Sequence, residues 1–130
     1  MSKAFIIQAC RAYIRDPFWT GLGYVMTEDE AKDAVAYLQV LNDPNISKFD
    51  IIEVEIKGDM TQTDMITIVR KYAYSDQSHP VSMVAFFDYE ARDQWTQEQN
   101  DDIHYCTVDP IQRWDSQRRN WKGGIYDNWA

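Results

Sequence analysis

Three residues with reactive side chains, Asp102, His104 and Cys106, occupy alternate positions of the segment DIHYCTV at residues 102–108. The segment predicts a strand, and alternate residues of a strand point to the same face. Such a face could bind a transition metal, or His104 could activate Cys106 as a thiolate. Neighbours on one strand face lie about 7 Å apart, so a direct bond between His104 and Cys106 would need favourable rotamers.

A simpler interpretation of the same three residues is structural. An unpaired cysteine is usually a small buried apolar residue, and His104 would then lie near a sheet edge. The chain has two histidines, and the other, His79, falls in a predicted turn before Pro80. We favour this interpretation and expect no metal and no cofactor, and we keep a small enzyme or metal-binding protein using Asp102, His104 and Cys106 as the alternative.

Other catalytic patterns are missing from the sequence. Gly21 and Gly23 lack the third glycine and the strand–turn–helix context of a phosphate loop, so they predict a turn. There is no CxxC, HExxH or GxSxG pattern. Glu53 and Glu55 alternate with apolar residues and predict the solvent side of a strand. The sequence therefore favours a non-catalytic protein over an enzyme.

Charge is unevenly distributed along the 130 residues, whose formal net charge is −8. Residues 88–109 hold seven acidic residues and one arginine. Such a surface repels nucleic acid and anionic lipid, so we expect no direct nucleic-acid or membrane binding. It could instead face a basic site on a partner protein. The predicted acidic binding surface consists of Asp88, Glu90, Asp93, Glu98, Asp101, Asp102 and Asp109.

The tail at residues 110–130 differs in composition, because it has four basic and two acidic residues, a balance of +2, and three of the five tryptophans. In one interpretation the tail folds back and buries its tryptophans against the acidic body. In another, Trp and Arg form a partner-binding hot spot, and in a third they stack single-stranded nucleic acid, which the acidic body disfavours. The candidate tail residues are Trp114, Arg118, Arg119, Trp121 and Trp129. Trp114 and Trp121 would share a face if this segment were helical.

The elements that would position these residues follow the same order in both halves of the chain. In the first half, strands are predicted at residues 5–14, 24–26 and 49–56, with a helix from the N-cap Thr27 to the stop at residues 42–44. In the second half, strands are predicted at residues 65–74, 81–87 and 102–108, with a helix that begins at the N-cap Asp88. Both helices contain E-A-[KR]-D, at residues 30–33 and 90–93.

The segment at residues 61–74 could form either a helix or a strand. Thr61 and Asp64 could cap a helix that carries Met65, Ile68 and Tyr72. Four consecutive β-branched residues at 66–69 lose side-chain freedom in a helix, so we predict a strand.

These elements predict an α+β fold in a single domain, residues 1–130. Two tandem strand–strand–helix–strand units, residues 1–58 and 59–109, would form a mainly antiparallel sheet of about six strands with both helices on one face, followed by the Trp-rich tail. The second sheet face would need a cover, which could be the tail or a second copy of the chain in a homodimer.

The function expected from the sequence is that of a small regulator or inhibitor that acts by surface contact on a protein partner. That partner's basic site could be one that binds nucleic acid, in which case the acidic surface would mimic phosphate charge. Such a compact chain fits a viral or mobile-element accessory protein, and a structural homo-oligomeric subunit is a further alternative. Two unpaired cysteines and an N-terminus unlike a signal peptide predict a cytoplasmic protein, in the host cytoplasm if it is viral.

Overall fold

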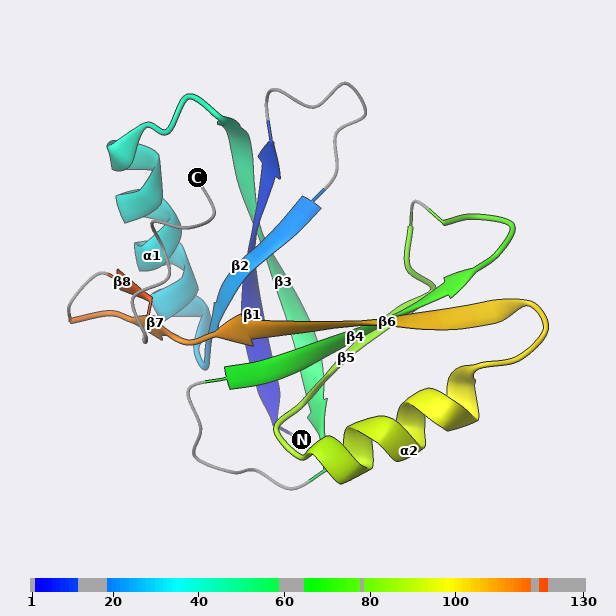
Figure 1. The fold of residues 1–130 in the computed structure, drawn as a ribbon. Coiled ribbons are helices and arrows are strands. Elements are labelled where there is room, and N and C mark those ends of the chain that lie inside the picture. Colours follow the sequence, from blue (N-terminus) through cyan, green and yellow to red (C-terminus); the bar gives the residue numbers. More distant parts are fainter. Residues whose placement is uncertain (1, 12–18, 59–64, 78, 118–119, 122–130) are drawn as a thin grey trace.

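The structure is a computed structural model that describes residues 2–11, 19–58, 65–77, 79–117 and 120–121 (Figure 1). Its elements are β1 (Lys3–Arg11), β2 (Trp19–Val25), α1 (Glu28–Leu41), β3 (Ile46–Lys57), β4 (Met65–Ala73), β5 (Ser82–Phe86), α2 (Tyr89–Gln99), β6 (His104–Gln112), β7 (Trp114–Asp115) and β8 (Asn120–Trp121). The described residues therefore form an α+β fold, as predicted.

Both helices begin at the predicted N-caps. The Thr27 hydroxyl accepts from the Glu30 N–H at 3.2 Å, which is the N-cap bond of the predicted capping box, and it also donates to the Glu30 carboxylate at 3.0 Å. The Asp88 carboxylate accepts from the N–H groups of Glu90 and Ala91 at the start of α2. At its other end, α1 stops where Asn42 takes a left-handed conformation with φ 51°.

In the second half of the chain, the segment that could have been a strand or a helix is a strand. Residues 66–69 lie within β4 and pair with β5 and β6, so the β-branched run is extended. The last strand is longer and later than predicted, since β6 begins at His104 and continues through Pro110 to Gln112. A proline is compatible with this position because β6 lies at the edge of the sheet. The predicted bounds of this strand, residues 102–108, were therefore wrong at both ends.

The large sheet has six strands in the order β2-β1-β3-β5-β4-β6, and the two halves join where β3 pairs with β5 in parallel. The other neighbouring pairs of this sheet are antiparallel, so the sheet is mixed. It curls, and an isolated bridge between Tyr24 and Arg113 brings the β2 edge to the end of β6. Inside the curl, both halves contribute to one buried cluster that includes Ile6, Ile68 and Ile111.

This curl corrects the expectation about the second sheet face. We expected the tail or a second copy of the chain to cover it. Instead the two halves of the sheet cover much of the concave face for one another, and Tyr24 of β2 contacts Phe87 edge-to-face at 6.0 Å. A single curled sheet can bury apolar residues on its concave face without a separate covering layer.

Both helices pack on the convex face. Leu38 of α1 lies in a cluster with Ile7 of β1, and Trp95 of α2 packs against Phe86 of β5 with ring centroids 5.9 Å apart. The burial differs between the helices, because α1 buries Ala31, Ala34 and Leu38 whereas α2 has no fully buried residue. The result is that α2 exposes much of its surface. Neither helix in the described ranges is long and apolar enough to cross a membrane.

Candidate binding surface

The turn that leads from α2 into β6 is held by Asp101. Its carboxylate accepts from the N–H groups of Ile103 and His104 at 2.9 and 2.7 Å and lies 3.1 Å from His104 Nδ1. The hydrogen bond from the Ile103 N–H, followed by that with the His104 ring, lowers the pKa of Asp101. Asp102, which we had grouped with His104, lies before the strand and is exposed, so the carboxylate beside His104 is that of Asp101.

The thiol of Cys106 is in an apolar setting. Cys106 packs beside Val69, Val84 and Phe86, and its N–H donates to Asn100 Oδ1 at 3.0 Å. Burial raises the pKa of the Cys106 thiol, and the nearby charge of Lys71 opposes that shift only in part. The protonated thiol therefore predominates at neutral pH, which disfavours nucleophilic attack.

A metal site also lacks a ligand set in the residues that the structure describes. No group of three or more His, Cys, Asp or Glu side chains is arranged there to hold a metal ion. His104 and Cys106 occupy alternate positions on β6, as predicted, but the third residue of the proposed set is not on that strand. The geometry supports the structural interpretation of Cys106.

The acidic residues of α2 gather on its solvent side. Glu90, Asp93 and Glu98 are exposed, and Asp101 and Asp102 follow directly after the helix. Residues 88–102 contain six carboxylates and one arginine, a charge of −6 + 1 = −5. We call Glu90, Asp93, Glu98, Asp101 and Asp102 the α2 acidic surface.

The cations beside this surface are already engaged. Arg92 pairs with Asp93 at 2.9 Å and lies 4.7 Å from the centre of the Tyr89 ring. Lys71 of β4 donates to the side chain of Gln99 at 3.1 Å. Asp88, the first of the predicted acidic residues, uses its carboxylate to cap the helix. The α2 acidic surface thus keeps a net negative charge at the surface of the protein.

Asp109 lies apart from the other predicted acidic residues. It belongs to β6 and pairs with Arg70 of β4 at 3.1 Å, and the Arg70 side chain is mostly buried. By the strand register, Asp109 stands opposite Ile68, so it lies on the concave face, whereas α2 covers the convex face. Its charge is compensated there, so Asp109 is not part of the α2 acidic surface.

The tail, as far as the structure describes it, packs on the body. Trp114 is 3% exposed, and its ring lies 6.1 Å from that of Tyr37 on α1. The backbone at Trp114 pairs with Trp121 in the β7–β8 ladder, so these positions are extended rather than helical. Arg118, Arg119 and Trp129 lie outside the described residues, and Trp121 is described as a strand position. Trp114 therefore contributes to packing on α1 rather than to an exposed hot spot.

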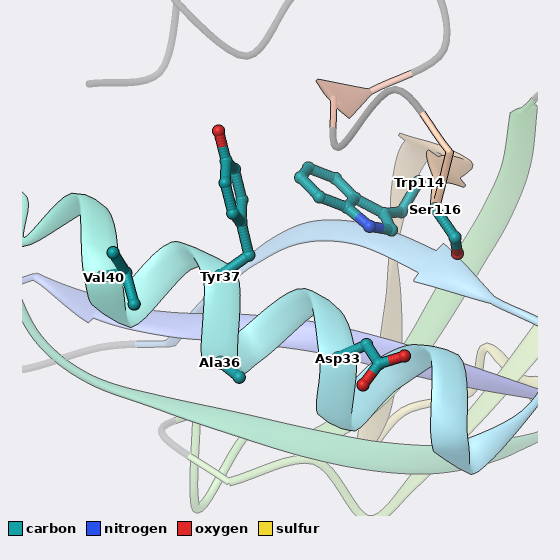
Figure 2. Close-up of a pocket in the computed structure, with 6 residues that line it drawn as sticks. All are labelled: Asp33, Ala36, Tyr37, Val40, Trp114 and Ser116. Carbon is teal, nitrogen blue, oxygen red and sulfur yellow. The ribbon is translucent and has the colours of Figure 1, made fainter.

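A surface groove of about 430 Å³ runs between α1 and Trp114, and Figure 2 shows Tyr37 and Trp114 rising on its two sides. Its lining residues are Asp33, Ala36, Tyr37, Val40, Trp114 and Ser116. The Ser116 hydroxyl donates to the Glu30 carboxylate at 3.3 Å, and that carboxylate also accepts from the Thr27 hydroxyl. The Ser116 hydroxyl therefore serves the first turn of α1, and the groove combines apolar residues with the Asp33 carboxylate.

Sequence reasoning missed a group of stacked tyrosines. Tyr72 and Tyr105 stand opposite each other on β4 and β6, with ring centroids 5.5 Å apart, and the Tyr74 ring lies 4.9 Å from that of Tyr105. The alternation of Tyr72 and Tyr74 is visible in the sequence. Their contact with Tyr105, thirty-one residues after Tyr74, depends on the β4–β6 register and could not be read from local spacing.

Comparison with known proteins gives no further guide. No family model matches the chain, and searches of curated proteins and of solved structures gave no match. The functional argument therefore depends on the surfaces of this protein itself.

Proposed function

We propose that this chain is a non-catalytic module that binds a basic site on a protein partner through the α2 acidic surface. The observation that supports this most directly is the placement of acid at the C-terminal end of α2. Glu98 lies in the last turn, which has no basic residue, and Asp101 and Asp102 follow. The helix dipole is negative at this end, so carboxylates there cost stability. Folding alone does not account for Glu98 and Asp102, and a charged partner would.

The charge of this surface selects the class of partner. A local charge of −5 on residues 88–102 repels nucleic acid and anionic lipid and attracts lysine- and arginine-rich protein surfaces. If the partner's basic site normally holds nucleic acid, the chain would compete with it as a mimic of phosphate charge. That competition would make the chain an inhibitor or regulator, a role in keeping with a viral or mobile-element accessory protein.

The test compares two charge-neutralised variants. In Glu90→Gln/Glu98→Gln two carboxylates of the α2 acidic surface are removed. The matched control Asp50→Asn/Glu53→Gln removes the same charge from exposed positions on β3. Partners captured from lysate by the parent chain at about 50 mM salt and identified by mass spectrometry would then be titrated as purified proteins at rising salt.

We expect the partner to be a basic protein whose affinity falls steeply with salt, since exposed charges are screened over about 8–10 Å at physiological salt. Affinity should fall further for the α2 variant than for the β3 control. Equal losses in both variants, or binding that is insensitive to salt, would contradict the assignment of the α2 acidic surface.

We also infer that the two halves of the chain are copies of one strand–strand–helix–strand unit. The support is that both halves follow the same element order, and that their strand orders, β2-β1-β3 and β5-β4-β6, correspond position by position. The E-A-[KR]-D match falls in the first turns of both helices. Related chains in which the halves resemble each other no more than unrelated segments do would argue against this duplication.

A further inference from the structure

We propose that Tyr72, Tyr74 and Tyr105 form a platform that receives an arginine side chain of the basic protein partner. This inference rests on the proposed function, because it adds an aromatic half to the same interface. The three residues are called the tyrosine platform below.

The tyrosine platform is an exposed extension of the concave face. Tyr72 continues the alternate positions of Ile68 and Arg70 on β4, beyond the buried cluster inside the curl, and Tyr74 lies in the turn directly after the strand. The ends of β4 and β6 that carry the platform run past β1, β2 and β3 (Figure 1). Tyr74 is 55% exposed, so a large part of this residue is accessible to solvent.

Apolar residues border the tyrosine platform. Ile103, whose carbonyl accepts from the Tyr74 N–H at 2.9 Å, is 63% exposed. Val81, whose N–H donates to the Lys71 carbonyl at 2.7 Å, is 59% exposed. Single exposed apolar residues are ordinary, but a group of them beside three stacked rings is typical of a contact surface.

The platform on the concave face and the α2 acidic surface on the convex side are connected through the backbone at one end of the sheet. Ile103, the neighbour of Tyr74, is also the residue whose N–H is held by the Asp101 carboxylate. Asp102 is the residue between them, and it is exposed. The Tyr74 backbone is therefore one hydrogen bond away from Ile103, which directly follows the two acidic residues Asp101 and Asp102.

This combination favours an arginine side chain. The face of a tyrosine ring attracts cations, and guanidinium groups stack on such faces more often than ammonium groups do. The neighbouring carboxylates would pair with the same guanidinium and oppose a nucleic-acid base, which brings phosphate with it. Arg92 over the Tyr89 ring shows the same kind of contact within this chain, at 4.7 Å.

A second copy of the chain is a poorer occupant. In a twofold dimer the same patch faces itself, so the platform of each copy would bring the Asp101 and Asp102 carboxylates of both copies together. Like charges placed this close oppose association. Charge complementarity therefore points to a basic partner protein rather than to self-association.

The direct test is an NMR titration of the full chain, labelled with ¹⁵N and ¹³C, with three capped peptides in which glycine alternates with arginine, lysine or citrulline. We expect the arginine peptide to shift the ring resonances of Tyr74 and Tyr105 together with the amides of Glu98 and Asp102. The lysine peptide should shift the rings less, and the citrulline peptide, which keeps the shape and loses the charge, should shift neither group.

A pair of tyrosine variants provides the matched control. Tyr74→Ala should weaken binding of the arginine peptide about two- to fivefold, as expected for one exposed cation–π contact, and Tyr74→Phe should restore it. Tyr89, also exposed at 62%, already has Arg92 over its ring, so Tyr89→Ala should leave the affinity unchanged. Equal losses for Tyr74→Ala and Tyr89→Ala would overturn the platform.

The outcomes separate this inference from the proposed function. Shifts along α2 without shifts in the tyrosine rings would overturn the platform and leave the acidic surface intact. No shift in either place would count against both. Ring shifts that grow with protein concentration alone, with a doubled mass by light scattering, would assign the face to a second copy. Ring shifts with an oligodeoxythymidine would assign it to nucleic acid, and either result would overturn the proposal.

Discussion

Replacing Glu98 by glutamine should make the protein more stable and at the same time weaken its binding to a basic partner. Glu98 lies in the last turn of α2, is exposed, and has no basic residue in that turn. Its side chain accepts a hydrogen bond from Gln94 at 3.3 Å, and a glutamine oxygen can accept the same bond. The substitution therefore removes the charge and keeps the contact.

The size of the effect follows from the helix dipole. An unfavourable charge in the last turn costs about 0.3–1 kcal/mol at low ionic strength. The hydrogen bond with Gln94 adds no difference because both side chains make it. For a chain of this length, such a gain in unfolding free energy corresponds to a rise in melting temperature of roughly 1–4 °C.

Thermal melts followed by circular dichroism, at low salt and at about 0.5 M salt, would measure this gain. The increase should be present at low salt and largely disappear at high salt, because exposed charges are screened. In parallel, the affinity for a basic partner should fall. A melting temperature that drops at low salt would refute the claim that Glu98 opposes the dipole. Unchanged partner affinity would refute the claim that Glu98 serves binding.

Three further changes test the fold and the turn before β6. Gly58→Ala should reduce the free energy of unfolding by about 1–3 kcal/mol and so lower the urea midpoint, because φ is 77° and an added Cβ would lie 2.9 Å from the Ala91 Cβ. An unchanged midpoint would contradict this close approach. Asp101→Ala should lower the melting temperature at neutral pH. The folded-state pKa of Asp101 is lowered, so its ionised carboxylate contributes fully to folding stability above the usual pKa of about 3.9. This contribution is lost as the pH falls through the folded-state pKa. If Asp101→Ala still lowered the melting temperature well below that pH, the stabilisation would not come from the carboxylate charge. Alkylation of Cys106 by iodoacetamide should be slow at neutral pH and accelerate only in alkaline solution, and rapid reaction at neutral pH would rule out the raised thiol pKa.

Much of the local structure could be predicted because it depends on neighbouring residues. The N-cap bonds at Thr27 and at Asp88 join residues three positions apart or fewer, so the sequence shows both partners. The extended run at residues 66–69 follows from side-chain crowding that is local to the backbone. The end of the last strand was missed because proline normally stops a strand, and only the edge position of β6 makes Pro110 acceptable.

The exposure of the acidic residues on α2 could be predicted in part, for a related reason. Glu90, Asp93 and Glu98 share one helix, and helical periodicity brings them to one exposed side. Asp109 lies on the other sheet face and pairs with Arg70, which distance along the chain could not show. Trp114 was assigned two opposed roles, and its burial against α1 required the packing of the tail on the body.

By itself, the sequence determined most element types, the helix starts and the concentration of negative charge along α2, since each depends on propensity, capping or periodicity within a few residues. The turn predicted at Gly21 and Gly23 was wrong, because both glycines lie within β2 and pair with β1. The tertiary structure decided which residues from distant segments meet: the curl that buries the concave face, the pairing of Arg70 with Asp109, and the stack of Tyr72, Tyr74 and Tyr105. These contacts depend on strand order and register, which are set by burial of the whole apolar surface at once, and no local pattern contains that information.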